Sequence, residues 1–270
     1  MATELLISRA PRRVWPLRRP ALWLLPLPLL MLMLVLGWLA LGAPPRNLVE
    51  PLLRWSPALG AGFALNILIS LLAIGLGTLA GLLVGVLNLS GTRLLRWPAR
   101  LWIQVFRNAP WLVLLYFTTY VFPFELHLAG HYLPFPDWLK VVVGLALPAS
   151  ANVAEILRGA INSIPATQWE AARSLAFTRG QIFRSIILPQ CCKRMLPPWM
   201  NLYAIITMGT ALASLVGVHD LLDTAQIASN TVNQVGFTVA IYFGVMALFF
   251  AYCYPISRFT QYLERRYACH

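Results

Sequence analysis

The sequence predicts an all-α membrane protein, a polytopic bundle of six transmembrane helices. Apolar residues make up 59% of the 270 residues and charged residues only 11%, whereas a soluble domain has about 45–50% and about 25%. The apolar residues fall in runs of about 20, the length that a helix needs to cross a bilayer core. The net charge of +12 is clustered between these runs, which indicates membrane topology and not a nucleic-acid-binding face.

Six runs are long enough to be spans. They cover residues 21–41, 62–88, 101–123, 139–157, 196–218 and 236–257. Pro148 interrupts the fourth run, and polar residues are scattered through the fifth. Residues 1–20 form a basic tail before the first run. A signal peptide is the competing interpretation of that run, but its apolar stretch is too long and Pro44 and Pro45 follow it, so we expect a retained helix.

Basic residues lie mostly on one side of the predicted spans. Eighteen of the 21 lysines and arginines fall in the tail or in the segments that follow the second, fourth and sixth spans. Arg46, Arg54 and Lys140 fall on the other side. That side also carries five acidic residues, Glu50, Glu125, Asp137, Asp220 and Asp223. Because loops rich in lysine and arginine stay in the cytoplasm, both termini are predicted to be cytoplasmic.

The residue patterns that catalysis would need are missing. Neither Lys140 nor Lys193 follows a glycine-rich phosphate loop, which excludes a Walker A nucleotide site. His127 and His131 have i, i+4 spacing but no carboxylate pattern beside them, so we interpret them as loop histidines and not as a metal site. We expect no catalytic residue, no cofactor and no metal, which leaves a channel, a carrier or a transporter subunit.

Four cysteines, Cys191, Cys192, Cys253 and Cys269, lie in or near the predicted cytoplasmic parts. They lack C-x-x-C spacing and have no neighbouring histidine ligand, so we expect reduced thiols.

The segment between the fourth and fifth spans, residues 158–195, is the most informative. A short helix is predicted over 167–175, with Thr167 as N-cap and Glu170 as its capping-box partner. Trp169, Ala172 and Leu175 are apolar residues available for burial, while small side chains at Ala171 and Ala172 allow another backbone to come close. Further on, Pro189 and the pair at 197–198 are expected to stop and restart the helix before the fifth span.

Within this segment the sequence resembles a known family. Glu170-Ala171-Ala172, followed by Leu175, Phe183 and Ile187-Leu188-Pro189, is similar to the EAA loop of binding-protein-dependent ABC transporter permeases. Further blocks resemble the polar amino acid branch of that family: Asn66 with Ser70-Leu71, FRNAP at 106–110, AEILRG at 154–159, SIP at 163–165 and LASLVGV at 212–218. The resemblance covers about residues 60–265.

The resemblance implies the type I ABC importer permease fold, with an extra helix at 21–41, a permease domain at 62–262 and a coupling loop at 158–195. It implies amino acid import across a bacterial inner membrane. The implied partners are a pair of ATPase subunits that supply ATP hydrolysis, a second permease and an external solute-binding protein. The positions that match the family's ATPase-coupling loop are Glu170, Ala171, Ala172, Leu175, Ala176, Leu188 and Pro189.

The sequence departs from the family at two places. The family usually has glycine where Ala176 stands, so we expect a turn that an ordinary residue can adopt, with slightly altered coupling geometry. The amino acid branch often has a Lys-Asp pair where this chain has Met208 and Gly209, which puts any substrate contact of that pair in doubt.

Small and polar residues mark faces of the predicted spans. Ala73, Gly77, Gly81 and Gly85 recur every four residues, a pattern that favours close helix packing over a ligand groove. The residues that could line a polar pathway are Asn66, Ser70, Thr207, Thr210 and Ser214. The alternatives are hydrogen bonds to neighbouring helices for the first two and bonds to carbonyls of their own helix for the hydroxyls. For Glu155 and Arg158 we favour a local ion pair over substrate binding.

Two other functions remain open. An importer permease for another small solute, such as an opine or a peptide, would have the same architecture. An ion-coupled carrier is of a different class, and it should show internal repeats and intramembrane charges, which we do not find.

Overall fold

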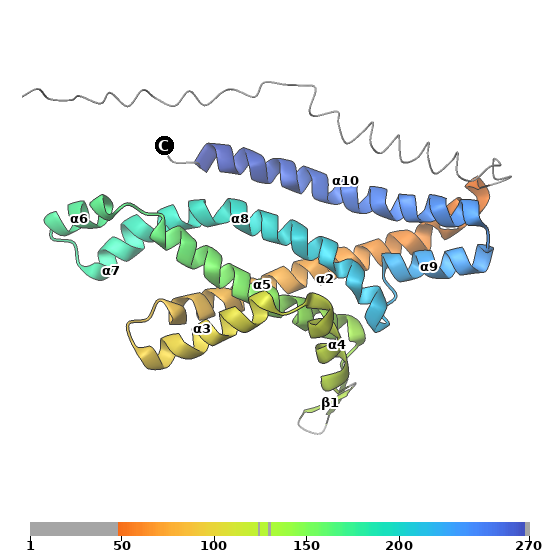
Figure 1. Ribbon diagram of the computed structural model, residues 1–270, viewed down its shortest axis with the longest axis horizontal. Coiled ribbons are helices and arrows are strands. Elements are labelled where there is room, and N and C mark those ends of the chain that lie inside the picture. The colour runs from red at the N-terminus through yellow and green to blue at the C-terminus, as the bar shows by residue number, and fades with distance from the viewer. Residues whose placement is uncertain (1–47, 124, 129–130, 268–270) are drawn as a thin grey trace, which may run out of the picture. The chain divides into compact units, whose positions relative to one another are not determined.

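The computed structural model describes residues 48–123, 125–128 and 131–267, so the basic tail, the predicted first span and Cys269 lie outside it. Figure 1 shows the elements. In chain order they are α2 (Val49–Asn88), α3 (Arg93–Asn108), α4 (Trp111–Val121), β1 (Glu125–Leu128), β2 (His131–Pro134), α5 (Asp137–Asn162), α6 (Ala166–Ser174), α7 (Arg179–Gln181), α8 (Leu188–Gly209), α9 (Leu221–Val232) and α10 (Val235–Tyr267). A π-helical stretch, Ile182–Ile187, precedes α8, and a 3₁₀ stretch, Thr210–Val216, follows it.

Four described helices are long and apolar enough to cross a membrane: Val49–Asn88, Asp137–Asn162, the combined segment Arg179–Val216 and Val235–Tyr267. They overlap the second, fourth, fifth and sixth predicted spans and are all longer. Pro148 lies inside α5 without ending it. The expectation that Pro197 and Pro198 stop the helix is wrong, because both lie inside α8. In a packed bundle neighbouring groups can satisfy the carbonyls that a proline leaves without a donor.

The third predicted span, 101–123, is not one helix. α3 ends at Asn108, Ala109 is extended with ψ of 135°, and α4 begins after Pro110. Proline disfavours helical geometry in the residue before it and cannot donate to the preceding turn. α4 is apolar but, at 11 residues, shorter than a bilayer crossing requires.

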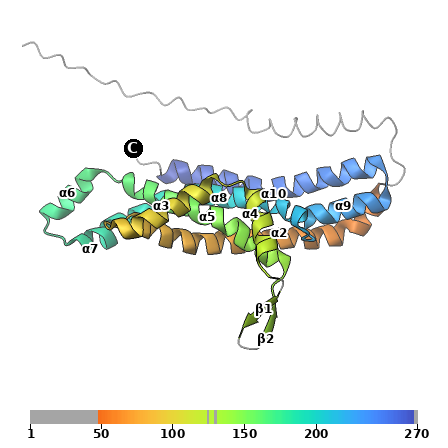
Figure 2. The same cartoon turned by 60° about the horizontal axis from the view of Figure 1, so that its bottom comes forward.

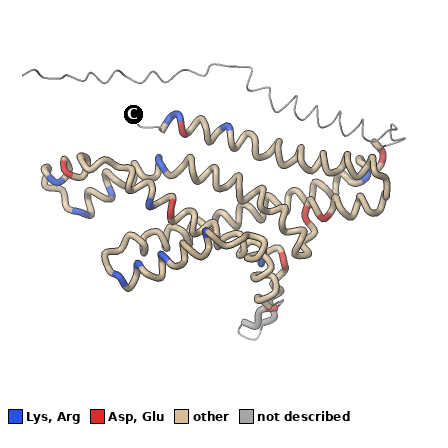
Figure 3. The backbone as a smooth tube through the Cα atoms, in the orientation of Figure 1, with Lys and Arg blue, Asp and Glu red and all other residues tan. Residues whose placement is uncertain are grey.

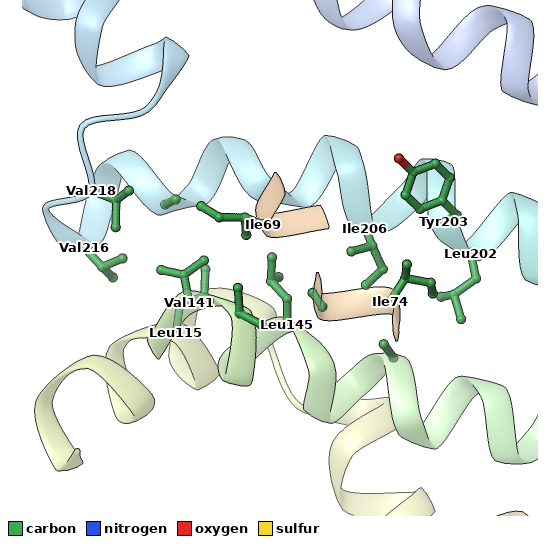
Figure 4. Packing of buried hydrophobic residues seen from close by; sticks show 14 of the residues in the cluster. Ile69, Ile74, Leu115, Val141, Leu145, Leu202, Tyr203, Ile206, Val216 and Val218 are labelled. Atoms are coloured by element: carbon green, nitrogen blue, oxygen red, sulfur yellow. The ribbon is translucent and has the colours of Figure 1, made fainter. Parts of the chain in front are cut away.

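The centre of the bundle is the contact between α2 and α5. A Cβ on Gly77 would lie 2.5 Å from the Cβ of Ala149, and one on Gly81 would lie 2.5 Å from the carbonyl oxygen of Ser150. Real Cβ atoms do not come so close, so only glycine permits this approach. The small-residue face therefore packs against another helix of the same chain. The sequence predicts close helix packing, either within the bundle or against a partner subunit, and the first of these is found. Figure 4 shows the buried cluster that surrounds the contact, with Ile69 and Ile74 from α2, Val141 and Leu145 from α5, and Leu202, Tyr203 and Ile206 from α8.

The remaining elements pack on this centre. α10 lies along α8 and α9, and α9 contacts α2. β1 and β2 form an antiparallel hairpin in which Glu125 pairs with Pro134; Figure 2 shows it standing away from the helices, beyond α4. The hairpin is an exception to the predicted all-α class. Lysines and arginines gather at the end that carries α6 and α7, together with the start of α3 and the end of α10 (Figure 3).

Candidate functional site

The segment predicted to couple transport to an ATPase folds as a helical hairpin at one end of the bundle (Figure 1). α6 leads into a turn, and the chain returns through α7 and the π-helical stretch into α8. The predicted short helix is therefore present, displaced by one residue at each end.

Its start differs from the prediction. Pro165 occupies the N-cap of α6, and no side chain caps the helix there, so the predicted Thr167 cap and its Glu170 partner are wrong. An extended proline already gives the chain its entry geometry, and Thr167 falls inside the first turn. The reciprocal capping box instead starts α7, where Thr178 and Gln181 each accept from the other's backbone N–H.

The two alanines of the motif lie on different faces of α6. Ala172 is only 2% exposed and packs in a small cluster with Ala160, Ile164, Ile182, Ile187 and Cys191. Glu170 and Ala171 are exposed. Ala172 thus belongs to the interior of the hairpin, and a charge introduced there would be buried.

Leu175, one of the apolar residues available for burial, is 73% exposed at the end of α6. Three other large apolar residues of the hairpin are also exposed, namely Phe177, Phe183 and Leu188. Ala176 and Pro189 are exposed as well. The outer surface of the hairpin therefore combines these apolar side chains with Glu170 and three exposed arginines, Arg173, Arg179 and Arg184.

The turn after α6 is left-handed at Ala176, whose φ is +58°. The backbone N–H of Phe177 donates to the carbonyl of Ala172 and that of Ala176 to Arg173, at 3.2 and 2.9 Å, which is a Schellman motif. The expectation of an ordinary turn at Ala176 is therefore wrong. Left-handed geometry costs a non-glycine residue about 1–2 kcal/mol, so the hairpin holds its alanine under strain.

Two side-chain contacts tie the hairpin to the bundle, and sequence reasoning missed both. Gln190 of α8 donates to the side-chain oxygen of Gln168 in α6. Arg194 of α8 donates from Nη1 to the carbonyl and the hydroxyl oxygens of Ser163, at 2.6 and 2.9 Å, just beyond α5. α6 and the end of α5 are thus joined to the same stretch of α8.

The polar residues proposed for a pathway lie inside the packed bundle. Asn66, Ser70, Thr207 and Thr210 are 0% exposed, and Ser214 is half-buried. Thr207, Thr210 and Ser214 donate to carbonyls three or four residues earlier, which is the alternative that the sequence left open. Within this conformation only Ser214 has surface to offer to a pathway.

Asn66 is the centre of a buried network. Its Nδ2 donates to Thr210 Oγ1 and to Asp220 Oδ2, both at 3.0 Å, and its Oδ1 accepts from the backbone N–H of Leu221 at 3.0 Å. Asp220 also caps α9 by accepting from the N–H of Asp223 at 2.9 Å. Burial raises the pKa of Asp220 above its usual value, and the hydrogen bonds from Asp223 and Asn66 partly oppose that shift.

Glu155 and Arg158 form the predicted local ion pair, at 2.8 Å. Arg107 of α3 also reaches Glu155, at 3.4 Å, so the pair joins α3 to α5.

Comparisons with known proteins agree with this geometry. Residues 74–268 match the profile of a family described as binding-protein-dependent transport system inner membrane component. The probable amino-acid ABC transporter permease protein YckA of Bacillus subtilis (strain 168) is 33% identical over 207 residues, 77% of this chain and 88% of that protein. The L-cystine transport system permease protein TcyB of the same organism is 30% identical over 226 residues, 83% of this chain and 92% of that protein.

A solved structure is also similar. It is a crystal structure of an amino acid ABC transporter with histidines, and its matched chain is 28% identical with a TM-score of 0.72, covering 83% of this chain and 100% of that chain. The family profile, the two relatives and the solved structure therefore all indicate the same class of membrane protein.

Proposed function

The chain belongs to the family of binding-protein-dependent transport system inner membrane components, and from this premise we propose that it is the permease subunit of an ATP-driven importer of amino acids. The observation that carries the substrate class is its likeness to YckA and TcyB, whose names state amino acid and cystine transport, over more than three quarters of the chain. Opines and small peptides are the alternative solutes.

The proposed orientation places the α6 end of the bundle in the cytoplasm of a bacterial cell. Support comes from the basic residues gathered at that end (Figure 3), since lysine and arginine are retained on the cytoplasmic side. Asp220 and Asp223 then lie on the external side, at the start of α9.

The proposed partners follow from what one chain offers. Most of its polar intramembrane side chains are enclosed within the protomer, so a pathway for a polar solute needs a second permease, either the same chain or a paralogue. A pair of ATPase subunits would dock at the cytoplasmic end, and a solute-binding protein would deliver the amino acid outside.

The proposed coupling element is the outer surface of the α6 hairpin. Glu170, Ala171 and Leu175 are exposed there, and they would contact the ATPase. Movement of the ATPase would displace α6 and pass to α8 through Gln168 and Gln190 and to the end of α5 through Arg194. Ala172 and the cluster around it keep the hairpin rigid, so the displacement is not lost in loop deformation.

The substrate is tested in proteoliposomes that contain this permease, its ATPase and its binding protein. ATP-dependent uptake of a panel of labelled amino acids is measured beside octopine and a dipeptide. We expect uptake of at least one amino acid with a polar side chain and none of the other two solutes. Uptake of octopine or the dipeptide alone would reject the amino acid assignment, and uptake without ATPase would reject the importer itself.

The coupling surface is tested with exposed and buried substitutions. Glu170→Lys and Leu175→Asp should leave the permease abundant in the membrane but lower both ATPase co-purification and uptake about tenfold. Ala172→Asp should instead lower abundance, because it buries a charge. Thr167→Ala, an exposed change on the same helix, is the control. Normal uptake and co-purification in both exposed variants would reject the coupling role.

A further inference from the structure

The first half of α3 combines basic and exposed apolar side chains. Arg93, Arg96 and Arg100 follow one another at intervals of three and four residues, and the helix contains no acidic residue. Between them Leu94 and Trp97 are 86% and 69% exposed. Water disfavours such an apolar surface, whereas the boundary between lipid headgroups and acyl chains accommodates both kinds of side chain.

Two clefts flank this part of α3 and share its arginines. A polar cleft of about 560 Å³ lies between α3, α5 and the end of α2, and its lining includes Arg96, Arg100, Glu155 and Arg158. A second cleft of about 620 Å³ is more apolar, and it is lined by Arg93, Leu94, Arg96, Trp97 and Arg100. Arg96 and Arg100 therefore stand between a polar space and an apolar one.

The charges in the polar cleft are not balanced. Among the described residues that line it, Glu155 carries the one carboxylate, and Arg158 and Arg107 already engage that group. Arg96 is half-buried. Neither it nor Arg100 has a hydrogen bond or ion pair with a residue in the described part of the chain. Guanidinium groups in this situation favour a phosphate, to which they can donate in pairs.

We propose that the first half of α3 binds an anionic phospholipid, with its phosphate at Arg96 and Arg100 and its acyl chains along Leu94 and Trp97. The adjacent apolar surface favours a lipid over free phosphate, because a phosphate ion has no apolar part to bury against it. The chain's own tail is a poor occupant, because residues 1–20 carry five arginines and one acidic residue and would be repelled. Lipid binding at this site does not depend on the transported solute. The lipid proposal and the proposed function can therefore fail independently of each other.

The test measures lipid retention by the purified full-length permease. Phosphatidylglycerol and phosphatidylcholine are added in turn, and bound lipid is counted by native mass spectrometry. Arg96→Gln/Arg100→Gln should bind phosphatidylglycerol at least about tenfold more weakly than the unchanged chain, since each basic residue near an anionic headgroup contributes to affinity. Binding of phosphatidylcholine should not change.

The matched control is Arg265→Gln/Arg266→Gln, which removes the same charge from the end of α10 and should retain the lipid. Gln104→Glu adds a carboxylate to the polar cleft and should weaken lipid retention without removing an arginine. This variant tests the proposal if Arg96→Gln/Arg100→Gln does not fold. Equal losses in the test and control pairs, or no loss in Arg96→Gln/Arg100→Gln and Gln104→Glu, would overturn the proposal. Displacement of the lipid by 10 mM inorganic phosphate would overturn it in favour of a phosphate site.

Discussion

At the scale of single residues, the left-handed alanine at position 176 is the clearest source of strain. Ala176→Gly should stabilise the hairpin by about 1 kcal/mol, because glycine adopts positive φ without the steric cost. Hydrogen exchange of the amides in α6 measures this as slower local opening. Ala171→Gly, on an exposed face of the same helix, should have the opposite effect. Faster exchange in Ala176→Gly would contradict the strain.

The Asn66 network gives a second prediction at this scale. Asn66→Leu should destabilise the permease by about 3 kcal/mol, because it leaves the buried Asp220 carboxylate and the Leu221 N–H without their partner. Thermal unfolding in detergent measures the loss. Ser70→Ala is the control, since among the described residues that hydroxyl donates only to the carbonyl of Ile67 in its own helix; it should cost below about 1 kcal/mol. Equal losses in the two variants would contradict the network.

Sequence reasoning identified Asn66 but not what it does. Its type and its place in an apolar span marked it as unusual, and hydrogen bonds to neighbouring helices were among the alternatives. Asp220, its partner, lies 154 residues further along the chain, in a segment that the sequence placed only as an external loop. No local pattern connects the two. The sequence likewise does not determine whether Leu175 is exposed, since a leucine near two alanines in a short helix is compatible with burial inside the chain and with docking to a partner.

At the scale of helices, the contact between α2 and α5 depends on side-chain size. Gly81→Ala should destabilise the bundle by about 1–3 kcal/mol, because its Cβ would strike the backbone of α5. A Cβ on Gly75 of the same helix would meet no other atom of the described part of the chain within 4 Å, so Gly75→Ala should be neutral or stabilising. Thermal unfolding of the two single variants measures the difference. Equal unfolding temperatures would contradict the close approach.

The link between α8 and the end of α5 gives a functional prediction. Arg194→Met should leave ATPase co-purification unchanged while uptake falls several-fold, because the docking surface is intact but the displacement no longer reaches α5. The neighbouring Lys193→Met removes an exposed charge and should transport normally. Uptake per ATP hydrolysed, measured in proteoliposomes, distinguishes the two. A loss of ATPase co-purification in Arg194→Met would place this arginine in the docking surface instead.

The sequence predicted helix centres better than helix ends. Hydropathy places the second span at 62–88, whereas α2 begins at Val49, because Glu50 and Arg54 lower the hydropathy of the first turns of the helix. Pro51 lies in the first turn of the helix, where a missing N–H matters least, whereas Pro57 lies inside the helix, which continues past it. The break at Ala109 separates two apolar runs that the prediction joins into one span, although Arg107, Asn108 and Pro110 stand at the break. The β1–β2 hairpin has no strong turn signal in its sequence.

At the scale of the whole molecule, the prediction concerns orientation. Reporter fusions at Leu48 and His131 should report an external position and a fusion at Gly180 a cytoplasmic one. The physical reason is the asymmetry of the basic residues about the spans. Paired reporters, one active only outside and one only inside, provide the control at each site. An external signal at Gly180 would show that the proposed orientation is inverted. The α6 hairpin would then lie outside the cell, where it could not contact an ATPase.

Over residues 73–85 the two faces of α2 differ in side-chain volume and not in polarity, and this has a consequence for its tolerance of mutation. Gly77, Gly81 and Gly85 lie against α5, while Leu79 and Leu83 are 72% and 63% exposed. In a saturation scan, substitutions on the glycine face should be rejected in order of size, even when they are apolar. Substitutions on the leucine face should be rejected in order of charge, even when they are small. Tolerance of substitution would thus depend on side-chain volume on one face of α2 and on charge on the other, and the two rules would alternate within each helical turn.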